Sequence, residues 1–284
     1  MAFCRKPDCV RTTEAGKTRC RTCRRNDKRG GRRPVRPVSA MRILMLDIET
    51  SPNLAYVWGL WDQNVALNQI ESTTEMICFA AKWLGEDRTM FWSAHEHGQA
   101  GMVQAAHDLL DEADAVMHFN GKAFDIKHLN REFLAAGLTP PAPYAQIDLL
   151  LEVRKNFKFP SNKLAYVSKA LGLAGKVEHS GFDLWRRCMA GEGKAWAEME
   201  LYNRQDVELL EEMYHLLLPW LTTRPNGNLY GDPGCPSCGV DTLRRSGFAY
   251  TKLSRFAQYH CATCGGWFRA SKRDVGVTVQ SVVR

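Results

Sequence analysis

The sequence has no apolar run that approaches the roughly 20 residues needed to cross a membrane. Its first ten residues, MAFCRKPDCV, contain basic residues but lack the apolar stretch that follows them in a secretory signal. Between residues 41 and 221 there are only two cysteines, Cys78 and Cys188, although the whole chain contains 10. We therefore expect neither a membrane protein nor a secreted, disulfide-stabilised one, but a protein of the reducing cytoplasm.

Charge is distributed unevenly over a chain of otherwise ordinary globular composition. The 284 residues are 45% hydrophobic and 24% charged, which suits one sizeable core and one or two small modules. Residues 1–40 carry 13 Lys/Arg against 3 Asp/Glu, residues 222–284 carry 9 against 3, and residues 41–221 carry 16 against 25. An acidic centre between basic ends fits a protein that grips a polyanion and holds cations, although solvated basic tails would give the same charges.

The remaining eight cysteines form two groups of four in the basic ends, which favours metal sites over disulfides in a cytoplasmic protein. These residues are Cys4, Cys9, Cys20, Cys23, Cys235, Cys238, Cys261 and Cys264. The C-terminal group contains two CxxC pairs with 22 residues between them, so we predict a structural, tetrahedral Zn²⁺ site in a zinc ribbon. The N-terminal spacing is looser. We expect a second Zn²⁺ there, and a disordered basic tail with free thiols is the alternative.

Composition divides the chain into five segments. The stretches KRGGRRPVRPVSA and TTRPNGNLYGDPG lack apolar periodicity and are interpreted as linkers. The predicted segments are an N-terminal zinc module (1–27), a basic linker (28–40), a central domain (41–221), a second linker (222–234) and the zinc ribbon (235–284).

The central segment begins with strands and continues as alternating strands and helices, which predicts an α/β domain with a mixed sheet flanked by helices. The predicted strands cover residues 41–50, 77–85, 88–94, 114–120 and 145–150. The predicted helices cover residues 99–113, 123–137, 161–173 and 194–220, the third of them capped by Ser161 or Asn162.

Acidic residues mark the ends of several of these elements. Asp47 and Glu49 are one residue apart at a strand end, so their side chains point to the same face. Asp125 lies near the start of a helix, and Asp206 follows Tyr202 by one turn of another. Taken singly, these are also explained by a solvated strand end, an acid favoured by a helix dipole and a surface pair.

Together, the acids have the composition that metal-assisted phosphodiester hydrolysis requires. Attack of water on a phosphodiester develops negative charge on the attacking and leaving oxygens, and two divalent cations about 3.5–4 Å apart stabilise both. Mg²⁺ and Mn²⁺ prefer oxygen ligands, so holding two such ions close together takes several carboxylates.

Three motifs, in order, resemble those of the DEDD superfamily of DnaQ-like exonucleases. They are Asp47-Ile-Glu49-Thr50, Asn120-x3-Phe124-Asp125 and Tyr202-x3-Asp206, within residues 41–220. Tyrosine before the last aspartate is typical of the tyrosine branch, which includes proofreading domains of DNA polymerases and some RNA-trimming enzymes. The further stretches SPNLAYVWGLW, HFNGKAFDIKHLN and GFDLWRRC resemble stand-alone exonucleases encoded by bacteriophages, which implies a bacterial host cytoplasm.

The resemblance implies a ribonuclease H-like core and a 3'→5' exonuclease that releases 5'-mononucleotides, preferentially from single-stranded DNA. It implies that four acids bind two Mg²⁺ or Mn²⁺, that Tyr202 orients the attacking water, and that further residues hold the terminal nucleotide. The implied metal ligands are Asp47, Glu49, Asp125 and Asp206, and the implied nucleotide contacts are Thr50, Asn120 and Phe124. Replication or repair proteins are candidate partners.

Two alternative functions remain open at this point. The tyrosine branch has RNA-processing members, so an RNA 3'→5' exonuclease would use the same residues. The other alternative is a non-catalytic zinc-finger protein that binds nucleic acid on an inactive nuclease scaffold. Inactive nucleases usually lose at least one metal ligand, whereas all four acids are present here.

Several other residues invite a functional interpretation. We expect His118 to be a core residue and Asp148 to cap a strand end. Lys176 and His179 are candidate phosphate contacts, whereas Trp185 and Trp196 are expected in the core.

The predicted ribbon also contains basic and aromatic residues that could bind a strand backbone and stacked bases. They are Arg244, Arg245, Tyr250, Lys252, Arg255, Phe256, Tyr259 and Trp267. The alternative is that the aromatic residues only form the minimal core of the ribbon.

Overall fold

The computed structural model describes residues 41–173, 180–231 and 234–278. The chain divides into two units, Met1–Ala40 and Met41–Arg284, and all described residues belong to the second. Predictions that lie outside the described residues are the N-terminal zinc module with its linker, Lys176 and His179. Among the described residues, no helix has both the length and the apolar character that a bilayer crossing requires.

A five-stranded mixed sheet forms the centre of the second unit, in the order β5-β4-β1-β6-β7. Its strands are β1 (Ile43–Thr50), β4 (Met76–Trp83), β5 (Met90–Ser93), β6 (Ala115–His118) and β7 (Ala145–Asp148). Strand β1 pairs antiparallel with β4 and parallel with β6, which confirms the predicted mixed α/β sheet.

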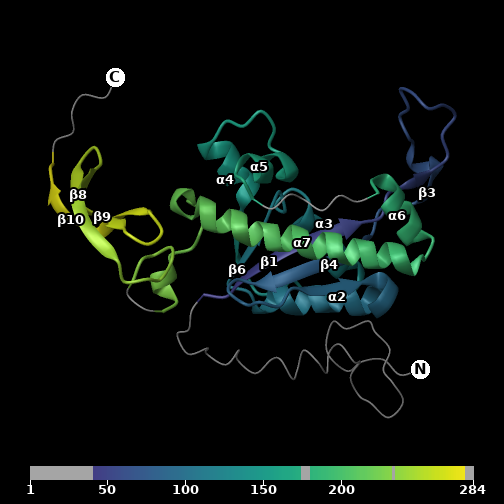
Figure 1. The fold of residues 1–284 in the computed structure, drawn as a ribbon, viewed down its shortest axis with the longest axis horizontal. Helices are drawn as coiled ribbons and strands as arrows, with labels where there is room; N and C mark the ends of the chain where they lie inside the picture. Colours follow the sequence, from purple (N-terminus) through teal and green to yellow (C-terminus); the bar gives the residue numbers. More distant parts are fainter. Residues whose placement is uncertain (1–40, 174–179, 232–233, 279–284) are drawn as a thin grey trace, which may run out of the picture. The chain divides into compact units, whose positions relative to one another are not determined.

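Helices cover both faces of this sheet, as expected when its central strand is apolar on both sides. The helices α2 (Ala94–Glu112) and α3 (Asp125–Ala135) contribute to one core cluster with alternate residues of β1 such as Leu44 and Leu46. Helix α7 (Gly193–Leu217) lies along β1 and β4 on the other face (Figure 1).

The face of β1 that meets α7 is set by the period of two along the strand. Ile43 and Met45 share a core cluster with Val207 and Leu210 of α7. The next residues on that face are Asp47 and then Glu49. The apolar packing at one end of β1 therefore fixes where both carboxylates point.

Shorter helices account for most differences from the predicted elements. The strand predicted over 145–150 ends at Asp148, whose side chain caps α4 (Leu149–Asn156) by accepting from the Leu150 N–H. The helix predicted over 161–173 is only α5 (Leu164–Ala170). Its N-cap residue is Lys163, which makes no side-chain cap, so the predicted cap at Ser161 or Asn162 was wrong. Helix α6 (Phe182–Met189) was not predicted, and α2 begins earlier than expected because it continues across a kink at Gly98.

Beyond β1, the chain forms a small hairpin of β2 (Leu54–Ala55) and β3 (Ile70–Ser72). The residues between these strands include η1 (Leu67–Gln69) and several exposed apolar side chains, with Trp58 96% and Trp61 83% exposed. The hairpin was not predicted, because its strands are too short to show a period-two pattern.

The C-terminal segment contains a separate three-stranded antiparallel sheet in the order β10-β9-β8. Its strands are β8 (Leu243–Tyr250), β9 (Ser254–Cys261) and β10 (Trp267–Gly276). A register shift in β8 falls between Arg245 and Phe248, where Gly247 has a φ of 77° that glycine adopts readily.

The segment after α7, predicted as a linker over 222–234, makes specific contacts around η2 (Leu218–Trp220) and η3 (Gly227–Leu229). Buried Glu152 of α4 accepts from the Thr222 N–H (3.1 Å) and the Thr223 N–H (2.9 Å). The Arg224 guanidinium donates to the Tyr214 hydroxyl (2.8 Å) and to the Pro236 carbonyl (2.6 Å). The described part of this segment is therefore tied to α4 and α7.

We predict that Glu152→Ala lowers the free energy of unfolding by about 1–3 kcal/mol, because the Thr222 and Thr223 N–H groups lose the carboxylate that accepts their hydrogen bonds. Burial disfavours the carboxylate, but hydrogen bonds from Thr222 and Thr223 outweigh it and hold the pKa of Glu152 below its ordinary value. The contribution is therefore complete above the ordinary pKa of 4.5 and is lost as the pH falls through the folded pKa.

Urea unfolding of both proteins between pH 3 and pH 8 measures this difference. Exposed Glu86→Ala is the control and should change stability little. A difference between wild type and Glu152→Ala that stays constant on acidification would contradict the assignment.

Candidate active site

Three carboxylates converge between β1 and α7. Asp47 and Glu49 lie on the face of β1 that meets α7, and Asp206 is buried on α7 itself. One oxygen from each of these three residues lies within 4.8 Å of the others. Carboxylate oxygens are the ligands that Mg²⁺ and Mn²⁺ prefer, so the donor set fits a hard divalent cation.

One face of α7 supplies the other polar groups of this site. Tyr202, Asn203 and Asp206 are separated by three and four residues, so they lie on neighbouring positions of the helix surface. All three are buried. The predicted pairing of Tyr202 with Asp206 is present, whereas Asn203 had not been singled out.

Asn203 orients the first carboxylate. Its side-chain N–H group donates to Asp47 Oδ2 at 2.7 Å and to the Asp47 backbone carbonyl at 3.3 Å. The only sequence signal for this role is the position of Asn203 beside Tyr202 and three residues before Asp206. A polar residue at that spacing on a helix predicts a shared face and cannot indicate which strand lies opposite.

The Tyr202 hydroxyl is held in its protonated form. Burial raises its pKa, and the negative charges of Glu49, Asp206 and Asp47, together with a hydrogen bond to Asp206, raise it further. The hydroxyl is therefore a hydrogen-bond donor at neutral pH, next to the three carboxylates. Its ring meets the Trp185 ring of α6 edge to face, with centroids 6.0 Å apart.

Asp125 lies outside the group of three carboxylates that converges. It opens α3, where a carboxylate is favoured by the helix dipole, and its Oδ1 accepts from the Ile48 N–H at 3.0 Å. Burial raises the pKa of Asp125 to about 7, against hydrogen bonds that lower it. The fourth predicted metal ligand is thus bound to the backbone between Asp47 and Glu49.

The motif around Asp125 forms the turn between β6 and α3. Asn120 has a φ of 72°, and its N–H donates to Asp148 Oδ1 at 3.0 Å. Phe124 is 40% exposed, and its ring lies 4.5 Å from that of His128. Both predicted nucleotide contacts therefore lie on this turn.

His118 and Asp148 accept hydrogen bonds from the backbone of that turn. His118 is completely buried, and its Nδ1 accepts from the Gly121 N–H at 3.0 Å. A β-carbon at Gly121 would lie 2.3 Å from the His118 ring, so only glycine fits there. The prediction of a core histidine is confirmed, whereas Asp148, predicted to cap a strand end, lies at the end of β7 and caps helix α4.

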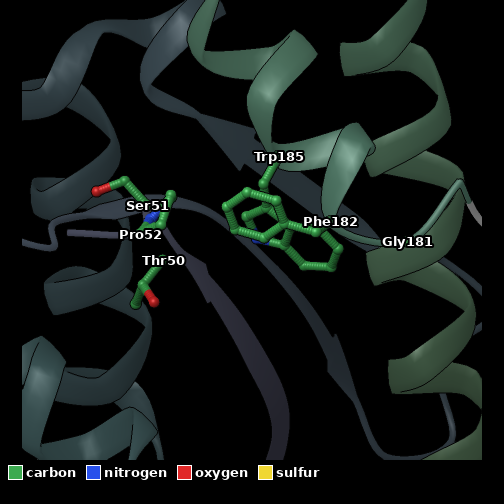
Figure 2. A pocket seen from close by; sticks show the side chains of 6 residues that line it. All are labelled: Thr50, Ser51, Pro52, Gly181, Phe182 and Trp185. Atoms are coloured by element: carbon green, nitrogen blue, oxygen red, sulfur yellow. The ribbon is translucent and has the colours of Figure 1, made fainter. Parts of the chain in front are cut away.

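A pocket of about 360 Å³ opens where β1 ends (Figure 2). It is lined by Thr50, Ser51, Pro52, Gly181, Phe182 and Trp185. In Figure 2 the two aromatic rings lie across the pocket from the residues that follow β1. Among the predicted nucleotide contacts, Thr50 lines this pocket, and Asn120 and Phe124 are not among its lining residues.

The two tryptophans expected in the core have different environments. Trp196 is buried, which confirms that prediction. Trp185 is half-buried and lines the pocket, so its prediction as a core residue was wrong in part. The reason is that α6, an unpredicted helix, turns one side of this ring towards solvent.

The four C-terminal cysteines form the second cluster of potential metal ligands. Their sulfur atoms lie within 4.8 Å of one another, with Cys235 and Cys264 3.6 Å apart and Cys238 and Cys261 3.7 Å apart. Four thiolates about 2.3 Å from one ion would be roughly 3.8 Å apart, so the arrangement fits a tetrahedral metal site. Burial opposes ionisation of Cys261, but hydrogen bonds from Cys264, Thr242 and their neighbours lower its pKa to about 6.

We predict that Asp125→Asn stabilises the protein when divalent cations are absent. Between pH 3.8 and about 7, the folded state keeps a proton on Asp125 that the unfolded state releases, so stability falls as the pH rises through that window. Asparagine keeps an acceptor for the Ile48 N–H without a charge. The gain in the free energy of unfolding at pH 8 should be on the order of 2–4 kcal/mol.

Chemical unfolding of the Mg²⁺- and Mn²⁺-free proteins at pH 4 and pH 8 measures this gain, which should be small at pH 4. Asp87→Asn, an exposed turn residue, is the matched control. Greater stability of the wild type at pH 8 would show that the Asp125 carboxylate is not held at an electrostatic cost.

A solved structure and a family model are similar to parts of this chain. Among solved structures, the chain is similar to the family B DNA polymerase of the hyperthermophilic archaeon Pyrobaculum calidifontis, with a TM-score of 0.47 and 17% identity. That match covers 63% of this chain and 25% of the polymerase chain. No curated protein sequence matches. A family model of the RNase_H superfamily matches residues 44–218, from β1 to the end of α7, and the chain therefore belongs to the RNase_H superfamily.

Proposed function

We propose that the chain is a metal-dependent 3'→5' exonuclease that removes 5'-mononucleotides from the 3' ends of single-stranded DNA. The observation that carries this proposal is the convergence of Asp47, Glu49 and Asp206 beside the buried Tyr202 hydroxyl. Direction of digestion and the preference for DNA rest on the resemblance of the three motifs to DEDD exonucleases of the tyrosine branch.

In this proposal, Asp47, Glu49, Asp206 and Asp125 hold two Mg²⁺ or Mn²⁺. When bound, such ions lower the pKa of the attacking water and stabilise charge on the attacking and leaving oxygens. The Tyr202 hydroxyl, whose proton is donated to Asp206, orients the water by accepting a hydrogen bond from it. Asn203 is a positioning residue, because it fixes the Asp47 carboxylate through a short hydrogen bond.

The pocket beside Thr50 supports an unpaired terminal nucleotide as the substrate. Its walls are apolar and aromatic, and the Trp185 ring that lines it also contacts the Tyr202 ring. An aromatic wall can stack on any base, which suits an exonuclease without sequence preference. A paired nucleotide would first have to leave its partner strand.

The four C-terminal thiols are proposed to bind one structural Zn²⁺. Soft thiolate ligands in tetrahedral arrangement favour zinc over the harder cations proposed for the carboxylates. The Zn²⁺ site at the N-terminal cysteines and the phosphate contact of Lys176 stay predictions from the sequence. Replication or repair proteins remain candidate partners on the resemblance alone.

We expect Asp206→Ala to abolish cleavage and to leave nucleic-acid binding largely intact. The substitution removes one of the three converging carboxylates without touching the pocket. The measurement is single-turnover cleavage of an end-labelled oligonucleotide with Mg²⁺ or Mn²⁺, alongside binding by fluorescence anisotropy. Exposed Glu212→Ala on the same helix is the matched control and should cleave like the wild type. Unchanged cleavage by Asp206→Ala would refute the site.

A time course on single-stranded DNA labelled at either end tests direction and substrate. We expect a ladder that shortens with time from the 5' label, immediate release of mononucleotide from the 3' label, and no reaction in a chelator until Mg²⁺ or Mn²⁺ is restored. Matched RNA is the comparison. Digestion of RNA alone would favour the exoribonuclease alternative, and digestion of neither would favour a non-catalytic binding protein.

A further inference from the structure

The three-stranded C-terminal sheet is the most basic part of the chain that the structure describes. Residues 234–278 contain seven Lys/Arg and two Asp/Glu. An excess of positive charge on so small a module points to a polyanionic partner.

The strand register sorts the side chains onto two faces, because residues directly opposite in antiparallel strands share a face. Arg244 of β8 lies opposite His260 of β9, which lies opposite Trp267 of β10. Arg269 is opposite Gln258, and Arg273 is opposite Phe256. The even-numbered positions of β9 thus gather one set of cationic and aromatic residues. We call this set, which consists of Arg244, Phe256, His260, Trp267, Arg269 and Arg273, the Arg–Trp face.

Ring contacts within the Arg–Trp face agree with the register. The Arg269 guanidinium lies 4.2 Å from the centroid of the Phe256 ring, and the His260 and Trp267 rings are 4.7 Å apart. Trp267 remains 55% exposed although it contacts His260. Cations and rings therefore alternate on a surface that is open to solvent.

The opposite face is occupied by the internal structure of the module. It includes buried Cys261 and, opposite Tyr259, the half-buried Phe268. Two cations, Arg245 and Arg255, lie on this face, and Arg255 stacks 4.3 Å from the Phe248 centroid and is neutralised by Asp274 at 2.7 Å. This face has less uncompensated charge to offer to a ligand.

We propose that the Arg–Trp face binds single-stranded nucleic acid, with guanidinium groups on the phosphates and the exposed Trp267 ring stacked on a base. Guanidinium groups recognise phosphate oxygens, and flat rings stack on unpaired bases whatever their sequence. A duplex hides its bases from such stacking, and an acidic peptide would need the arginines alone. The inference deepens the proposed function, because it assigns a second contact to the strand whose 3' end is digested.

The test compares matched substitutions on the two faces in the full chain, in an Asp206→Ala background that prevents digestion. The first variant is Arg244→Ser/Arg273→Ser on the Arg–Trp face. Its control with the same charge change is Arg245→Ser on the opposite face combined with Lys252→Ser in the turn between β8 and β9. Trp267→Ala is matched by Tyr250→Ala, since Tyr250 is 72% exposed and lies on the other face. Zinc content and thermal melting verify that each variant is folded.

Binding of a fluorescent 20-nucleotide DNA strand, a matched RNA and a DNA duplex is measured over a range of salt concentrations. We expect Arg244→Ser/Arg273→Ser to weaken single-strand binding at least tenfold and to reduce the slope of log K against log salt by about 1.4. Trp267→Ala should weaken it at least about fivefold with an unchanged slope. The two control variants should stay within about threefold of the parent.

Equal losses on both faces would overturn the proposal in favour of diffuse electrostatic attraction, and no loss on either would exclude the surface. Loss in the arginine variant alone, with poly-glutamate competing as well as DNA, would indicate an acidic protein partner instead. Cleavage of a trinucleotide by the same variants, with Asp206 intact, separates this proposal from the proposed exonuclease. Binding to the Arg–Trp face without any cleavage would refute only the latter.

Discussion

The packing of α7 against β1 is the interaction on which the candidate site depends. Ile43 and Met45 of the strand are buried against Val207 and Leu210 of the helix, which fixes the distance and rotation of the two elements. Asp47 and Glu49 are the next two residues on the same face of β1. Tyr202 and Asp206 lie on the same helix, α7. The apolar end of this contact therefore stabilises an arrangement of like charges that would repel one another if left to themselves.

Several parts of this arrangement follow from local pattern alone. The period of two along β1 predicts that Asp47 and Glu49 share a face, and the four-residue spacing on α7 predicts the pairing of Tyr202 with Asp206. Both are present in the structure. The mixed sheet was also predictable from the order of strands and helices, because that order constrains the layers of an α/β domain.

Other parts depend on contacts between distant segments. Asp125 accepts a hydrogen bond from the Ile48 N–H, and Asn203 donates one to Asp47. No local sequence pattern indicates either partner. The helices α4 and α6 are eight residues each, too short to show a clear helical period. Asp148 ends one element and caps the next, so the boundary between strand and helix could not be located from the apolar run that crosses it.

Helix α7 has two separate attachments whose angular relation is fixed. Near its middle, Asn203 and Asp206 face β1, and near its end Tyr214 receives the hydrogen bond from Arg224. A single residue inserted between them would turn one attachment by about 100° relative to the other. Length variation among homologous chains should therefore be absent between Asp206 and Tyr214, and insertions should accumulate in the turns on either side of the helix.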